Sequence, residues 1–302
     1  MDMRRLALIL LLVSMALFGC IAICKRSLTD SGLSSFDVTF IRLFVATATI
    51  TLMMLITRHF FTVKLKDLPF LLLFGLFKFL TDYTYFTALD YTSVSLATVL
   101  QNTAPYFVMI VSYFLLRQKV SKRALIAIMV GSFGCVLMSW AALTGTSLDP
   151  AGVLFALSSG FFLGMFYIGS DVSITKGYDA AKYMFYMMAT AMIISIFFTD
   201  VPKVVSSMSD TSVLVNSLIL GILMTLVPYY ITAWAVKYLG ALTVSVISVT
   251  EVVFATLVGV LYFNEPIGIL DMIGILMMIL SVVMISVGSA VQEKKDEGAQ
   301  ST

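Results

Sequence analysis

The sequence predicts an all-α integral membrane protein with ten transmembrane helices arranged as two inverted five-helix repeats. Three features lead to this fold class: the apolar composition, the length of the apolar segments and the placement of the basic residues. Hydrophobic residues make up 60% of the 302 residues, charged residues make up 12%, and the mean hydropathy is +1.02. A soluble chain of this length needs more polar surface, so the lipid bilayer is an expected partner.

The apolar segments are continuous and about twenty residues long, which matches a helix crossing a hydrocarbon core roughly 30 Å thick. Strands of a membrane barrel would instead alternate between apolar and polar residues. Charged residues and clusters of glycine, proline or serine bound the segments. The predicted spans are residues 5–24, 36–57, 68–89, 93–116, 122–141, 150–170, 180–199, 212–236, 241–262 and 268–290.

The basic residues predict the orientation of these helices. With the N-terminus in the cytoplasm, 14 of the 19 Lys and Arg side chains fall in cytoplasmic segments, and two, Arg42 and Lys78, fall inside spans. The outer loops hold only Lys25, Arg26 and Lys203. This asymmetry satisfies the positive-inside rule for an even number of spans. It predicts a multi-pass protein of the bacterial inner membrane with both termini cytoplasmic.

Two halves of the chain match each other in register. Residues 1–145 and 146–291 are the predicted repeats, and residues 292–302 are a charged, polar tail that is predicted to be disordered and cytoplasmic. Thr103, for example, aligns with Thr250 without gaps in the surrounding segment. Because each repeat holds five spans, the second repeat is inverted relative to the first. Inverted repeats are typical of secondary transporters.

Four ionisable side chains fall well inside predicted spans: Arg42, Lys78, Asp82 and Glu251. A charge in the bilayer costs at least about 2.5 kcal/mol, so each side chain needs a partner or a water-filled cavity. We predict that the first three bind substrate. Glu251 is the predicted proton-coupling residue, because small and apolar residues share its helix face and it has no basic partner on its own helix.

A structural role remains open for these charges. Lys78 and Asp82 are four residues apart on one helical face, so they can neutralise each other without touching a substrate. Arg42 lies near the outer end of its span, from where its long side chain can reach the interface. The sequence does not decide between these roles and binding.

Polar and proline residues interrupt two spans. Gln101, Asn102 and Pro105 predict a break in the fourth span, because proline removes a backbone donor, and Pro228 predicts a break in the eighth. The two amides can contact a substrate or bond to neighbouring helices. Both amides are predicted to bind substrate.

Three tyrosines are also predicted substrate contacts: Tyr85, Tyr229 and Tyr230. Aromatic walls suit a cavity for an apolar or ring-bearing ligand, with core packing as the alternative role.

No cofactor, metal site or catalytic set is expected. The three cysteines lie in apolar runs, where a thiol acts as a small hydrophobe, and the one histidine, His59, lies in a predicted cytoplasmic loop. The sequence contains no P-loop, nucleophile elbow or dinucleotide motif, so an enzyme is not expected. No basic block could follow a phosphate backbone, so nucleic acid is not an expected partner. A homodimer remains open.

Several motifs together carry a family resemblance that covers nearly the whole chain. They are Phe18-Gly19, Arg42, Ala88-Leu89-Asp90-Tyr91-Thr92-Ser93, Thr103-Ala104-Pro105-Tyr106-Phe107, Glu251, Leu261-Tyr262-Phe263-Asn264-Glu265 and Gly274. This pattern resembles the ten-span EamA-type members of the drug/metabolite transporter superfamily. The chain departs from it at Gln118, where glutamate is usual, and at Val252, where proline is usual. The resemblance implies alternating access through a central cavity lined by both halves, with the fifth and tenth spans peripheral.

The predicted function is a secondary transporter that moves a small-molecule metabolite by alternating access. The membrane cations suit an anionic group and the membrane acids suit an amine, which favours an amino acid or a related zwitterion or carboxylate. The energy would come from a proton, from another ion or from exchange. Alternatives with the same fold are multidrug, sugar-phosphate and nucleotide-sugar carriers, and a channel or structural membrane subunit is the alternative of another class.

Overall fold

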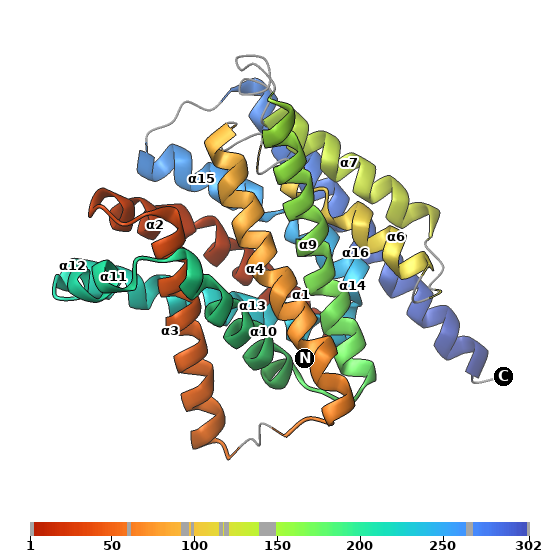
Figure 1. Ribbon diagram of the computed structural model, residues 1–302. Coiled ribbons are helices and arrows are strands. Elements are labelled where there is room, and N and C mark those ends of the chain that lie inside the picture. The colour runs from red at the N-terminus through yellow and green to blue at the C-terminus, as the bar shows by residue number, and fades with distance from the viewer. Residues whose placement is uncertain are drawn as a thin grey trace.

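The computed structural model of the protein is helical in every regular element that it describes (Figure 1). Six residues named above lie outside its described part, as does most of the predicted fourth span before residue 100: His59, Thr92, Ser93, Gln118, Asn264 and Glu265. The described residues are 3–58, 62–91, 97, 100–114, 117, 121–138, 149–263 and 268–300.

The helices of the first half follow the five predicted spans in order. The first span consists of α1 and α2, which form one apolar segment of 28 residues with a bend at Cys20. It extends to Asp30 and is therefore longer than the predicted 5–24. The elements are α1 (Met3–Gly19), α2 (Ile21–Asp30), α3 (Ser35–Ile56), η1 (Leu65–Asp67), α4 (Leu68–Tyr91), α6 (Ala104–Phe114) and α7 (Lys122–Met138).

The second half repeats this order. Three helical pieces, α12, η3 and α13, run consecutively through the eighth span, and α14 and α15 make up the ninth. The elements are α9 (Pro150–Thr175), α10 (Ala180–Ser195), η2 (Ile196–Phe198), α11 (Val201–Ser207), α12 (Thr211–Leu218), η3 (Ile219–Leu226), α13 (Val227–Leu239), α14 (Ala241–Ser248), α15 (Glu251–Phe263) and α16 (Ile269–Gln300).

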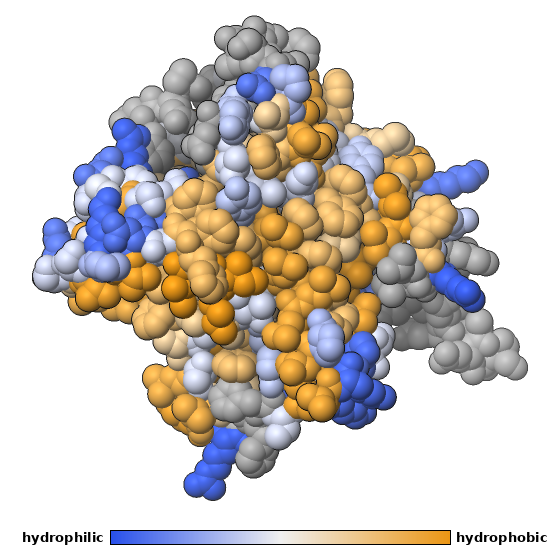
Figure 2. All heavy atoms as spheres, viewed as in Figure 1, coloured by the Kyte–Doolittle hydropathy of each residue, from blue (hydrophilic) through white to orange (hydrophobic). Residues whose placement is uncertain are grey.

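Six helical segments among the described residues meet the length and hydropathy of a membrane crossing. α4 is 24 residues long and is not one of them. It carries Lys78 and Asp82, which lower its hydropathy. In Figure 2, an apolar surface occupies the middle of the visible face, and hydrophilic residues gather toward its ends. This distribution suits a protein surrounded by lipid.

The last helix is longer than the predicted tenth span, which ends at residue 290. α16 continues to Gln300, well beyond residue 291. Gln, Glu, Lys and Ala, which occur in this segment, are good helix formers. Extending an existing helix avoids the cost of a new nucleus, so such residues can prolong it.

Local sequence signals explain where several helices begin and turn. Ser34 and Asp37 form a capping box at the start of α3, and Asp149 caps α9. Gly32 and Gly177 both have a positive φ, at 87° and 83°, in the turns that follow the first span of each repeat. Glycine adopts this left-handed conformation without a steric penalty. The same turn chemistry therefore recurs in the two repeats.

The fourth and ninth spans are interrupted at equivalent positions of the repeat. Residues 102–103 form a turn before α6, and residues 249–250 form a turn before α15. The hydroxyl of Thr103 donates to the carbonyl of Leu100 at 2.6 Å, and that of Thr250 donates to Ile247 at 2.7 Å. The fourth span has a proline shortly after its turn, Pro105, and the ninth span has none at the equivalent position. The hydrogen bond from the threonine hydroxyl is therefore the feature that the two interruptions share.

This second interruption lies inside the predicted ninth span, residues 241–262, which the structure reproduces as an apolar segment of 22 residues, Ala241–Tyr262. Glu251 lies in the middle of this span and is the first residue of α15. No glycine or proline stands at 249–250, which is why composition did not indicate the interruption.

The eighth span changes its helical type before Pro228. η3 is a π-helix, and the hydroxyl of Thr225 donates to the carbonyl of Leu220 five residues earlier at 2.8 Å. A Cβ added to Gly221 would lie 2.4 Å from the Cβ of Val45 on α3. The glycine therefore permits the close contact that brings this π-helix against the part of α3 that carries Arg42.

Glycines also bring the interrupted spans close to their neighbours. A Cβ on Gly160 of α9 would lie 2.9 Å from the carbonyl oxygen of Gln101, at the break of the fourth span. A Cβ on Gly19 would lie 2.7 Å from the Cβ of Phe254 on α15. α7 and α16 pack extensively on each other and lie side by side at the right of Figure 1.

Candidate functional site

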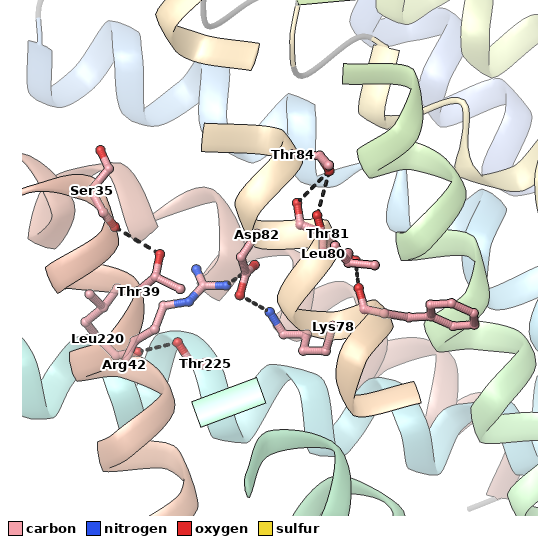
Figure 3. A network of polar contacts seen from close by, with 11 residues as sticks. Ser35, Thr39, Arg42, Lys78, Leu80, Thr81, Asp82, Thr84, Leu220 and Thr225 are labelled. Atoms are coloured by element: carbon pink, nitrogen blue, oxygen red, sulfur yellow. Dashed lines mark hydrogen bonds and ion pairs between the residues drawn. The ribbon is translucent and has the colours of Figure 1, made fainter. Parts of the chain in front are cut away.

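Three of the four predicted membrane charges meet in one buried cluster. The Nη2 atom of Arg42 lies 2.7 Å from Oδ1 of Asp82, and Nζ of Lys78 lies 2.6 Å from Oδ2 of the same carboxylate. The three residues are 8%, 2% and 6% exposed, respectively. Figure 3 shows Arg42 reaching from α3 toward α4, where Lys78 and Asp82 lie one turn apart. Two cations therefore share one anion.

The two cations occupy different surroundings. Nζ of Lys78 lies 4.8 Å from the ring centroid of Tyr229, so an aromatic face of the second repeat also contacts it. The Nε of Arg42 is buried and has no hydrogen-bond partner among the described residues. An unpaired donor on a buried guanidinium is costly. It therefore marks a place where an additional acceptor would be stabilising.

Glu251 lies within electrostatic reach of this cluster. Its carboxylate interacts with the charge of Arg42 across the interface between the repeats. No hydrogen bond or ion pair within the described residues involves it. The sequence placed it without a basic partner on its own helix, and the structure provides a cation from α3 at longer range. Together the four groups have no net formal charge.

A cavity of about 450 Å³ is lined by residues of both repeats. Six of the predicted site residues line it: Arg42, Asp82, Tyr85, Gln101, Tyr229 and Glu251. The described lining does not include Lys78, Asn102 or Tyr230. Lys78 contacts two residues of this lining, since its Nζ bonds to the carboxylate of Asp82 and lies over the ring of Tyr229.

Aromatic side chains that the sequence did not single out as contacts complete the wall. Phe18 and Phe166 line the cavity, and their ring centroids lie 4.8 and 5.1 Å from that of Tyr229, both edge to face. Tyr167 lines the cavity beside them. Phe18 was visible only as part of a family motif. Phe166 and Tyr167 stand in a uniformly apolar run, where no sequence signal distinguishes a wall residue from a core residue.

The cavity reaches the end of the molecule predicted to be extracytoplasmic. Its lining includes Ala22 and Arg26 of α2, both of which are exposed. At that end the two repeats also touch. The backbone N–H of Asp200 donates to Asp37 at 3.1 Å, and Nζ of Lys203 donates to the carbonyl of Gly32 at 2.6 Å.

A polar contact joins the two repeats at the opposite, predicted cytoplasmic end. Nζ of Lys176 lies 2.6 Å from Oδ1 of Asp67, and the hydroxyl of Tyr178 donates to Oδ2 at 2.8 Å. These two bonds, the one from Lys176 first, hold the pKa of Asp67 below its ordinary value of 3.8. The contact therefore persists at neutral pH, and its contribution to stability is lost only as the pH falls below that ordinary value.

Comparison with known proteins identifies the family. The model of the EamA-like transporter family matches residues 5–140 and 150–287. The chain belongs to the EamA-like transporter family. It is therefore a multi-pass membrane transporter and not an enzyme, and the ten-span fold of two inverted repeats is confirmed.

Relatives of this EamA-like protein carry general names. An uncharacterized transporter of Archaeoglobus fulgidus is 26% identical over 277 residues, which are 91% of this chain and 94% of the relative. One of Clostridium kluyveri is 28% identical over 199 residues, 64% of this chain and 63% of the relative. A solved structure described only as a crystal structure of a protein superposes with a TM-score of 0.75 at 17% identity, covering 96% of this chain and 99% of the other. That likeness shows the fold alone.

Proposed function

We propose that this EamA-like transporter carries a small zwitterion, such as an amino acid, or a related carboxylate by alternating access. The observation that supports this most directly is the charge arrangement: two buried cations share the carboxylate of Asp82, and the fourth charge, Glu251, lies apart from them. Such an arrangement offers a cationic place and an anionic place within one cavity. A zwitterion uses both.

Arg42 is the proposed receptor of the anionic group. One side of its guanidinium bonds to Asp82, and its buried Nε has no acceptor among the described residues. A substrate carboxylate would supply that acceptor and would relieve the excess positive charge of the cluster. Glu251 then faces the amine, and the aromatic wall of Phe18, Phe166 and Tyr229 receives the apolar part of the substrate.

Glu251 is also the proposed proton carrier. Membrane acids without an ion-pair partner commonly serve as proton sites in transporters. If the proton and the substrate both change the charge balance around Arg42, each alters the affinity for the other, which couples the two fluxes thermodynamically.

Counterflow in liposomes tests this function. Vesicles containing the purified protein would be loaded with neutral amino acids, the matching amides or the matching deaminated acids, and uptake of the labelled amino acid would be measured. We expect saturable exchange with the zwitterions and weaker exchange with both analogues. Arg42→Gln should raise the half-saturating concentration about tenfold or more, because a charge-assisted bond is lost.

Other results of the counterflow experiment would support a different function. Exchange supported only by apolar cations would favour a multidrug carrier, and exchange supported only by phosphate esters would favour a sugar-phosphate or nucleotide-sugar carrier. Flux that does not saturate would contradict a carrier altogether and would indicate a channel.

We also propose that the protein lies in a bacterial inner membrane with both termini in the cytoplasm. The excess of basic residues at one end of the spans supports this orientation. Alkaline phosphatase fused after Thr302 should be inactive, whereas the same reporter inserted between residues 208 and 209, in the predicted outer loop, should be active. Activity of the fusion after Thr302 would contradict the orientation.

A further inference from the structure

α2 presents one polar face to the cavity. Ala22, Lys25, Arg26 and Thr29 all line the cavity, and their spacing places them on a single side of the helix. Nζ of Lys25 lies 4.4 Å from the ring centroid of Phe86, another lining residue. This contact holds the ammonium group of Lys25 against the cavity wall.

Basic residues are rare at this end of the protein. Of the 19 Lys and Arg residues, only Lys25, Arg26 and Lys203 lie in the predicted outer segments. Two of the three line the cavity, and the third bonds to the carbonyl of Gly32 instead. Since the positive-inside rule disfavours basic residues in outer segments, their concentration at the cavity needs a local reason.

The charges along the cavity are also unevenly distributed. The two acids of the described lining, Asp82 and Glu251, belong to the central cluster around Arg42. The charged residues that α2 contributes to the lining are both basic. An anionic group that approaches along α2 therefore meets two cations before it meets either lining acid.

We propose that Lys25 and Arg26 form a capture site for the anionic group of the substrate, of the carboxylate class, at the extracytoplasmic mouth of the cavity. This inference rests on the proposed transport of a zwitterion or carboxylate. The site raises the local concentration of anions at the mouth and passes the anionic group on to Arg42. Charge of one sign at the entrance of a cleft accelerates the entry of the opposite charge, in favourable cases about 10- to 1,000-fold, and salt weakens the effect.

Cysteine-reactive probes of opposite charge test the site without knowledge of the substrate. Cys20, Cys24 and Cys135 are first replaced by alanine. A single cysteine is then introduced at Ala22, on the exposed mouth, or at Ala255, a lining residue on α15. The rates of labelling by the anionic sulfonatoethyl and the cationic trimethylammonioethyl methanethiosulfonate are compared at low and high salt.

The ratio of anionic to cationic labelling rates is the readout. We expect a ratio well above that of free cysteine at low salt, and a fall of about tenfold in the variant carrying Lys25→Gln and Arg26→Gln. The exchange variant with Lys25→Arg and Arg26→Lys should retain the ratio. Lys203→Gln is the matched control, since it removes an outer cation that does not line the cavity, and it should leave the ratio unchanged.

An unchanged ratio in the double glutamine variant, or an equal loss in the Lys203→Gln control, would overturn the capture site. Neither outcome depends on transport. A charge-dependent ratio combined with failed amino-acid counterflow would reject the proposed substrate while retaining an anion-attracting mouth.

Discussion

Asp82→Asn is expected to destabilise the protein more than any other single substitution in the central cluster. The asparagine would leave both Arg42 and Lys78 buried without their shared anion. Removing one partner of a buried ion pair costs about 3–5 kcal/mol, and here two pairs lose the same partner. The effect would be measured as the shift in the midpoint of thermal unfolding in detergent, with unfolding monitored through the loss of monodisperse protein.

Lys78→Gln is the matched comparison. It removes one of the two cations and leaves the pair of Arg42 and Asp82 neutral, so its unfolding midpoint should stay closer to that of the parent. Asp82→Glu keeps the charge and should also be milder than Asp82→Asn. If Lys78→Gln proves as damaging as Asp82→Asn, the shared carboxylate does not organise the cluster.

Glu251→Gln is expected to separate exchange from proton-driven accumulation. Glutamine mimics the protonated acid permanently, so the cavity can no longer load and release a proton at this position. It can still exchange substrate, with a higher half-saturating concentration because the amine loses its anionic partner. In liposomes, counterflow should persist, while accumulation driven by a pH gradient should be lost. Glu251→Asp retains a titratable group and should keep part of the coupling.

Asp67 is less suited to explain a pH dependence between about pH 5 and pH 8. The pKa of Asp67 is held below its ordinary value, so this residue remains ionised throughout that range. Asp82 is bonded to two cations. Should Glu251→Gln keep pH-driven transport intact, the proton must move through Asp82 or the carrier must work by exchange alone.

The sequence by itself determined the membrane fold. Long apolar runs indicate spans because burial in lipid depends on the composition of about twenty consecutive residues, which is a local property. The same reasoning identified Arg42, Lys78, Asp82 and Glu251, since any charge within such a run is conspicuous. The matching register of Thr103 and Thr250 predicted the repeat, and the structure shows the same interruption at both residues.

Only the tertiary structure decided how these charges are used. Arg42 and Asp82 are 40 positions apart, and their pairing depends on how α3 packs on α4. That packing, like the close contact of Gly221 with α3, cannot be inferred from a local segment of the sequence. Composition also could not separate Lys78, which holds Asp82 from outside the cavity lining, from Arg42, which lines it. Phe166 and the basic face of α2 became part of the site because distant helices converge on one cavity.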